Sequence, residues 1–184
     1  MDIDDYLERL CVLLRSTDRE AGTRSGLQPV HWQTLRYLAA CNRYSDTPAG
    51  IVEFLGQTKG SVSQSIKILE TKGLLEKRPD ASDRRVVHLR LTDEATRLLL
   101  AVGPDQRLRS VTEQLPMPTR AALNEGLKQL LQALQHANGR RSFGLCASCR
   151  FNERSDAGYR CGLTGDLLSA HDVTRICREH VDED

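Results

Sequence analysis

The order of apolar and polar positions predicts a chain made mostly of amphipathic helices. Apolar residues recur at helical spacing over residues 3–20, which predicts an amphipathic helix. The glycines within residues 22–26 predict that this helix breaks there. Pro29 suits the first turn of a second helix, which continues over residues 31–42 and carries the single tryptophan of the chain. Both stretches therefore predict helices that bury one face.

Two short helices joined by a tight turn are predicted next. Thr47, which precedes a proline, can cap the first of them, and Gly56 can end it. Thr58 can cap the second, and Gly73 stands where a left-handed residue would end it. The apolar positions of this second helix share one face: Val62, Ile66 and Leu69. The pattern is that of a helix-turn-helix.

The sequence after Gly73 predicts a charged β-hairpin. A first strand ends at Pro79, a polar turn covers residues 80–85, and a returning strand covers residues 86–91. Helix, strand, charged hairpin and strand is the order of a winged helix-turn-helix. The predicted fold class is therefore mainly α with a small β-wing (α+β).

Positive charge is concentrated in this same part of the chain. The stretch from Thr58 to Leu91 contains eight lysines and arginines but only four acids. Its net charge is therefore +4, whereas the whole chain carries only +1. Basic side chains on one surface attract phosphates, and short polar side chains at the start of a helix can reach base edges in the major groove. The alternative is a solvated face that binds nothing. The candidate DNA contacts are Thr58, Lys59, Ser61, Ser63, Gln64, Ser65, Lys67, Lys77, Arg78, Asp83, Arg84 and Arg85.

Residues from about 27 to 100 resemble the multiple-antibiotic-resistance regulator (MarR) family of bacterial transcription factors. The stretch from Gly60 to Ala95, GSVSQSIKILETKGLLEKRPDASDRRVVHLRLTDEA, carries the resemblance. The family usually shows Asp-x-Arg-Asp-x-Arg at the tip of the wing, whereas Ser82 stands here in place of the first arginine. The resemblance implies a homodimer that pairs helices from both chain ends, double-stranded DNA as the partner, and a possible small-molecule effector.

Two further helices are predicted after the wing, over residues 93–102 and 120–137, with a polar stretch between them. The second helix carries a leucine stripe that we expect to form a dimer interface with the N-terminal helix. Such a symmetric dimer would place two recognition helices about one DNA turn apart, on a pseudo-palindromic operator. The predicted regions are 1–26 (N-terminal dimerisation helix), 27–103 (DNA-binding lobe), 104–139 (C-terminal dimerisation helices) and 140–184 (cysteine-rich metal-binding module).

The composition changes after residue 139, and four of the six cysteines follow. A Cys-x2-Cys pair can turn two thiolates onto one metal, and two more cysteines complete four ligands, which suits a [4Fe-4S] cluster or Zn²⁺. The predicted metal ligands are Cys146, Cys149, Cys161 and Cys177. In a zinc alternative, Cys177 and His180 form the second ligand pair and Cys161 is spare. Free thiols or a dithiol switch are further alternatives, and Cys11 and Cys41 are expected to be packed thiols.

The remaining patterns restrict the class of function. The chain has no run of eighteen apolar residues and no signal-peptide pattern, so we expect a cytoplasmic protein. A glycine-rich phosphate loop and a His-Glu-x-x-His motif are both absent, so we expect no enzymatic activity. The predicted function is a DNA-binding transcriptional regulator that senses redox or iron–sulfur status, with the cysteine segment acting on the helix before it. The alternatives are a structural zinc site with a small-molecule effector, or a winged helix that binds protein.

Overall fold

The structure is a computed structural model that describes residues 1–81, 83–102, 105–137, 139, 141–155 and 158–182. Its helices are α1 (Ile3–Ser25), α2 (Pro29–Ala40), α3 (Pro48–Leu55), α4 (Lys59–Thr71), α5 (Asp93–Val102), α6 (Asp105–Glu113), α7 (Met117–Ala137), the 3-10 helix η1 (Cys146–Ser148) and α8 (Ala170–Val173). Its strands are β1 (Leu75–Pro79), β2 (Val87–Leu91), β3 (Asn152–Ser155), β4 (Gly158–Cys161) and β5 (Leu167–Leu168). The fold class predicted from the sequence is confirmed.

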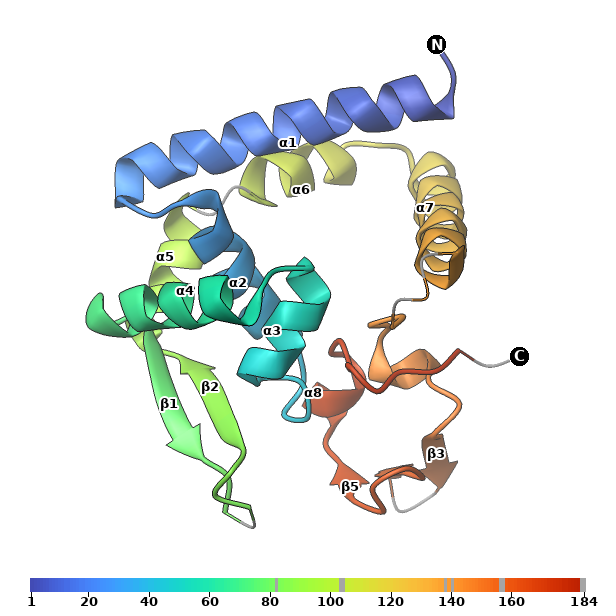
Figure 1. Cartoon of the computed structure of the whole chain (residues 1–184). Helices are drawn as coiled ribbons and strands as arrows, with labels where there is room; N and C mark the ends of the chain where they lie inside the picture. The colour runs from blue at the N-terminus through green and yellow to red at the C-terminus, as the bar shows by residue number, and fades with distance from the viewer. Residues whose placement is uncertain (82, 103–104, 138, 140, 156–157, 183–184) are drawn as a thin grey trace.

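The winged helix-turn-helix consists of α2, α3, α4 and the hairpin of β1 and β2 (Figure 1). The two strands pair antiparallel, with Leu75 opposite Leu91 and Pro79 opposite Val87. One hydrophobic core joins the helices to the hairpin and is built from fully buried side chains, among them Trp32, Leu35, Ile51, Leu69 and Leu89. This core holds α4 and the wing in one rigid arrangement.

The predicted caps explain where these helices begin and end. The hydroxyl of Thr47 accepts a hydrogen bond from the amide of Gly50 (3.2 Å), and the hydroxyl of Thr58 accepts one from the amide of Ser61 (3.2 Å). Gly56 ends α3 in the left-handed region with a φ of 62°. The sequence-based boundaries of α3 and of the start of α4 are confirmed.

The break predicted within residues 22–26 falls at the end of that range. The helix α1 continues through Gly22 to Ser25, and Gly26 ends it with a φ of 64°. Gly22 is needed for packing instead, because a Cβ there would lie 2.4 Å from the carbonyl oxygen of Leu27. The helix α6 lies where the sequence predicts only a polar stretch. Leu108 and Val111 are its only large apolar residues, and two such residues give little helical periodicity.

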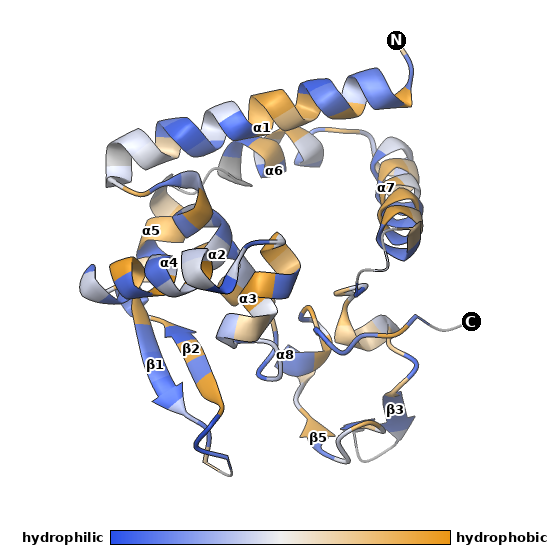
Figure 2. Cartoon of the chain, viewed as in Figure 1, coloured by the Kyte–Doolittle hydropathy of each residue, from blue (hydrophilic) through white to orange (hydrophobic). Residues whose placement is uncertain are grey.

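The apolar faces of α1 and α7 are exposed in the single chain. Figure 2 shows apolar positions along both helices, and α7 has no buried residue. Its exposed leucines are Leu123, Leu127, Leu131 and Leu134. Cys11 on α1 is also exposed, so the expectation of a packed thiol there was wrong for the single chain. A search of the described residues finds no helix that combines the length and the apolar character of a membrane span.

The C-terminal segment, residues 141–182, folds against the winged helix rather than extending away from it. It holds a small antiparallel sheet in the order β3-β4-β5, flanked by η1 and α8. Ile176 pairs with the end of α2, because its amide donates to the carbonyl of Ala40 (2.9 Å) and its carbonyl accepts from the amide of Asn42 (2.9 Å). Residues 138 and 140, at the predicted start of this region, lie outside the described residues.

Candidate nucleic-acid interface and cysteine site

One face of α4 carries exposed polar side chains. Ser63, Gln64 and Lys67 lie on the solvent side of the helix, and Lys59 and Ser61 are exposed in its first turn. Val62, Ile66 and Leu69 on the opposite face are buried in the core, as predicted. The helix therefore presents one polar face to solvent at fixed orientation. Thr58 is exposed as well, but its hydroxyl already caps the helix.

Ser65 does not belong to this face. Its side chain is only 4% exposed, and its hydroxyl donates to the carbonyl oxygen of Ser61 (3.0 Å). Of the predicted DNA contacts on α4, Ser65 is therefore the one whose side chain is turned toward the core, beside Ile66. A serine within a helix often satisfies its hydroxyl in this way.

The wing carries basic side chains that are held by acidic neighbours. The ammonium of Lys77 lies 2.6 Å from the Glu70 carboxylate. The guanidinium of Arg78 lies 3.0 Å from the Glu76 carboxylate. All four side chains are largely exposed, so these pairs orient the cations without neutralising the surface.

The turn of the hairpin is organised by Asp83. Its carboxylate accepts hydrogen bonds from the backbone amide (3.0 Å) and the guanidinium (2.9 Å) of Arg85. These bonds from Arg85 lower the pKa of Asp83. Asp83 therefore positions Arg85, while Arg84 is exposed on the same turn. Ser82, which replaces the family's first arginine, lies outside the described residues.

His88 on β2 links the wing to the connection between α2 and α3, a role the sequence did not reveal. Its Nδ1 lies 2.5 Å from the Asp46 carboxylate, and its Nε2 lies 3.0 Å from the Asp80 carboxylate. Burial lowers the pKa of His88, but the bonds to the two carboxylates outweigh burial and raise it overall. The amide of Leu89 also donates to the carbonyl of Asp46 (2.7 Å).

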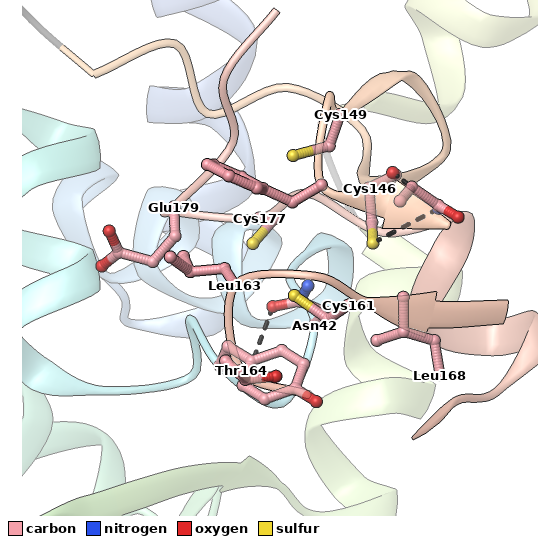
Figure 3. A pocket seen from close by; sticks show the side chains of 12 residues that line it. Asn42, Cys146, Cys149, Cys161, Leu163, Thr164, Leu168, Cys177 and Glu179 are labelled. Atoms are coloured by element: carbon pink, nitrogen blue, oxygen red, sulfur yellow. Dashed lines mark hydrogen bonds between the residues drawn. The ribbon is translucent and has the colours of Figure 1, made fainter. Parts of the chain in front are cut away.

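The four predicted metal ligands surround one cavity of about 190 Å³. Cys146 and Cys149 come from η1 and its end, Cys161 from the end of β4, and Cys177 from the segment after α8. Figure 3 shows the four sulfur atoms directed into the same space. Residues far apart in the sequence are thus gathered as the spacing predicted.

The sulfur atoms surround this space without meeting at one point. Among the described residues, no group of three or more His, Cys, Asp or Glu side chains is arranged to hold a single metal ion. A tetrahedral zinc site has Zn–S distances of about 2.3 Å and so needs sulfur atoms about 3.8 Å apart. The arrangement leaves a gap between the thiols instead.

Burial favours the protonated form of two of these thiols, Cys146 and Cys177. Burial, followed by the nearby thiolate of Cys177, raises the pKa of Cys146 to about 11. Burial also raises the pKa of Cys177, and the side-chain amide of Asn42 opposes that shift. Several thiolates in one apolar cavity repel one another, so a cation is needed to hold them ionised at neutral pH.

His180 lies apart from the cysteine cavity. Its ring is buried, with Nδ1 2.7 Å from the hydroxyl of Ser142 and Nε2 3.2 Å from the hydroxyl of Ser148. The structure therefore assembles Cys161, rather than His180, with the other three cysteines. Cys41 is buried at the end of α2 and does not line the cavity, in agreement with a packed thiol.

The cysteine segment contacts α2 and α3 through polar and aromatic side chains. The Arg178 guanidinium forms two hydrogen bonds of 2.7 Å to the Glu53 carboxylate. The ring of Phe143 lies 5.2 Å from that of Phe54 and 6.2 Å from that of Tyr37. The residues that hold the cysteine cavity are thus in direct contact with the helix-turn-helix.

Comparison with known proteins agrees with the winged helix. Residues 25–86 match the sequence model described as the MarR family. The "Transcriptional repressor MprA" of Escherichia coli (strain K12) is 26% identical over 134 residues, which cover 70% of this chain and 76% of MprA. Proteins of this family are transcriptional regulators and not enzymes, which supports the expectation that the chain has no enzymatic activity.

Two solved structures share the fold at low sequence identity. The MepR–DNA complex of S. aureus has a TM-score of 0.57 at 21% identity and covers 72% of this chain and 98% of its own. CouR from Rhodococcus jostii RHA1, bound to p-coumaroyl-CoA, has a TM-score of 0.57 at 21% identity and covers 70% of this chain and 91% of its own. The family match ends before the first cysteine of the cavity. Residues 25–86 are therefore a winged helix-turn-helix of the kind found in MarR-family transcriptional regulators.

Proposed function

We propose that this chain is a DNA-binding transcriptional regulator of the MarR type. The observation that carries the proposal is the exposed polar face of α4 beside a hairpin whose exposed turn carries Arg84 and Arg85. A helix of this kind fits the major groove with Ser63 and Gln64 toward the bases, while the basic wing meets phosphates. MepR, which shares the fold, has been solved as a complex with DNA.

The proposed regulator acts as a homodimer on a pseudo-palindromic operator. Its α1 and α7 expose apolar side chains along most of their length, which a soluble surface rarely does without a partner. Pairing these helices by two-fold symmetry would bury the leucines and place two α4 helices on one face of the DNA. The homodimer is the arrangement that the exposed stripe favours.

We further propose that Cys146, Cys149, Cys161 and Cys177 hold a [4Fe-4S] cluster. The four thiols border a cavity, and a cluster carries a core of its own that needs such a space. When bound, the cluster supplies a centre whose integrity depends on redox and iron status. The side chains of this chain supply the four thiolates and exclude water from them.

Zinc is the alternative, and it demands a different arrangement of the same residues. The thiols would have to close inward until their sulfur atoms lie about 3.8 Å apart. A zinc site of that kind would act as a fixed brace between the cysteine segment and α3. The signal would then come from a small-molecule effector, as CouR was solved with p-coumaroyl-CoA.

The cysteine segment has contacts through which it could influence DNA binding. The Asp182 carboxylate accepts a hydrogen bond from Gln132 of α7 (2.7 Å), which supports the predicted effect on the dimer helix. A second set of contacts reaches α3 through Arg178 and Glu53. A change in the segment would therefore bear on both the dimer helix and the DNA-binding helices.

The DNA part is tested by selecting a duplex from a random library with the purified protein and measuring its affinity against salt. Lys67→Ala should weaken binding on all sequences and reduce the salt slope by about 1. Gln64→Ala should relax the preference for particular bases. Lys128→Ala, which removes the same charge from the exposed surface of α7, is the control. A winged helix that binds protein instead would yield no selected duplex.

The metal part is tested by the visible absorption spectrum and metal analysis of protein purified without oxygen. A brown sample with about four irons per chain supports the cluster. A colourless sample with about one zinc per chain supports the alternative. A metal-free sample that also takes up neither iron and sulfide nor zinc contradicts both.

A further inference from the structure

Asn42 is one of two residues of the winged-helix lobe, with Tyr44, that line the cysteine cavity. It lies in the connection between α2 and α3, is 2% exposed, and lines the cavity together with the four cysteines (Figure 3). Its Oδ1 accepts hydrogen bonds from the amide of Tyr44 (3.1 Å) and the hydroxyl of Ser45 (2.8 Å). Two acceptor bonds thus fix the orientation of the amide group.

The other end of the same side chain is unsatisfied. The Nδ2 of Asn42 is buried and has no hydrogen-bond partner of ordinary geometry among the described residues. A buried amide donor without an acceptor costs free energy, so such an atom points to a partner that belongs there. The sulfur of Cys177 belongs to the lining of the same cavity, and the Asn42 side chain lowers the pKa of its thiol. A metal-bound thiolate is a far better acceptor than a neutral thiol, because its sulfur carries negative charge.

Asn42 is also the first residue of a short path to the wing. The hydroxyl of Ser45, which donates to Asn42, accepts the backbone amide of Arg178, the residue after Cys177 (2.8 Å). The next residue, Asp46, accepts the amide of Leu89 on β2 through its carbonyl and contacts His88 through its carboxylate. Residues 42–46 therefore touch the cysteine site at one end and the wing at the other.

We propose that Asn42 donates a hydrogen bond from Nδ2 to the sulfur of metal-bound Cys177 and that residues 42–46 transmit the occupancy of the cysteine site to the wing. This inference rests on the proposed function, since it requires both a bound metal group and a DNA-binding wing. With the site loaded, the hydrogen bond holds the connection in one position. With the site empty, the bond weakens, and the connection and the wing are less restrained.

The route makes a reciprocal prediction. If loading the cysteine site changes DNA affinity by some factor, DNA must change the affinity for the metal group by the same factor. Residues that bond to a ligand typically contribute a 10- to 100-fold change in metal affinity. Removing the Asn42 donor should therefore affect both metal retention and the dependence of DNA binding on metal.

The chain offers a matched control in Asn152, a second asparagine that lines the cavity. It lies on β3 within the cysteine segment, and its Nδ2 donates to the carbonyl of Cys146 (2.8 Å) and lies 3.8 Å from the sulfur of Cys146. Asn152 has similar chemistry toward a cysteine, but it belongs to the cysteine segment and not to residues 42–46. Comparing Asn42→Ala with Asn152→Ala therefore separates loss of a cavity amide in the lobe from loss of one in the segment.

The experiment uses full-length protein loaded with ferrous iron and sulfide without oxygen, with zinc as the second load. Affinity for the selected duplex is measured for loaded and metal-free protein, and release of the metal to a chelator is followed in parallel. The wild type should show a ratio of affinities in the range of about 5 to 150. Asn42→Ala should bring this ratio close to 1 and release metal about 10-fold faster. Asn152→Ala should also release metal faster but keep the wild-type ratio.

Asn42→Asp is a second variant that controls for misfolding. It keeps the acceptor bonds to Tyr44 and Ser45 while removing the Nδ2 donor. It should behave as Asn42→Ala does, and circular dichroism checks the fold of each variant. The inference is overturned if both Asn42 variants keep the wild-type ratio or the wild-type rate of metal release. If the wild type takes up no metal, or loads without any change in DNA affinity, the proposed sensing function fails and the inference fails with it. Failure of the inference alone is thus distinct from failure of the function.

Discussion

The winged-helix lobe and the cysteine segment are stabilised in different ways. The lobe buries a continuous set of large apolar side chains, including Trp32, Leu35 and Ile51, each 0% exposed. Among the described residues, the core of the segment consists of the thiols of Cys146 and Cys177 and two buried aliphatic side chains, Leu168 and Val173. Hydrocarbon packing therefore holds the lobe, whereas the segment relies on its docking contacts and, in the function that we propose, on a group bound by its cysteines.

This difference agrees with the separate tasks that we propose for the two regions. A region with a full apolar core keeps its shape under changing conditions, which suits a surface that must match DNA. A region whose order depends on a ligand responds when that ligand is lost, which suits a sensor. Substitutions in each region test whether the two regions are stabilised in these different ways.

The largest effect should come from the double substitution Cys146→Ser and Cys149→Ser. Structural zinc in small domains contributes about 10–16 kcal/mol of apparent binding free energy, and the segment should lose its order without comparable coordination. Metal analysis should show loss of the bound metal, and limited proteolysis should cut within residues 141–182. The helical circular dichroism of the lobe should remain. Unchanged metal content would contradict the assignment of these ligands.

A core truncation in the lobe should come next. Leu69→Ala removes a 0%-exposed side chain from α4 and should lower the free energy of unfolding by about 2–5 kcal/mol. Urea unfolding followed by circular dichroism measures this loss. The control is Leu167→Ala, a 68%-exposed leucine of the segment, which should change the stability by less than about 0.5 kcal/mol. Equal effects of the two substitutions would remove the contrast between the regions.

The contact between the regions should have a smaller effect. Glu53→Gln keeps the shape of the side chain but removes the charge that binds Arg178, and should cost about 1 kcal/mol because both side chains are partly exposed. We expect the segment to be cleaved faster in this variant than in the wild type when the rate of proteolysis is measured at the same temperature. Glu94→Gln, which breaks the exposed pair with Arg97, should leave that rate unchanged. A wild-type rate in Glu53→Gln would show that the aromatic contacts suffice.

The smallest effect should be a pH dependence of the wing through His88. Its pKa is raised in the folded state above the ordinary value of 6.5, so protonated His88 stabilises the fold. That contribution is complete below pH 6.5 and is lost as the pH rises through the raised pKa. The difference in melting temperature between the wild type and His88→Asn should therefore shrink as the pH rises above 6.5. A difference that grows with pH would reverse the assigned sign.

Sequence patterns predicted those parts of the molecule that depend on neighbours along the chain. Thr47, Thr58 and Gly56 mark helix ends because a cap acts within one turn. The basic hairpin was evident from its polar turn and paired strands. The winged helix could be predicted for the same reason, since each of its elements has a local signal.

The partners of individual side chains were less predictable. Ser65 has the same chemistry as its exposed neighbours, and only the direction of its Cβ toward the core separates it from them. The helix α6 was not predicted, because its apolar positions are too few to show a clear helical period. His88 gave no local signal for its place between Asp46 and Asp80.

Local sequence patterns were enough to predict the helix limits around the turn, the charge of the hairpin and the grouping of the four cysteines. The docking of the cysteine segment on the helix-turn-helix and the place of Asn42 in the cavity became visible only in the folded chain. The physical reason is sequence separation: the bond from the amide of Arg178 to Ser45 joins residues 133 positions apart. No local propensity encodes such a contact. It forms only when the apolar core has brought the two distant segments of the chain together.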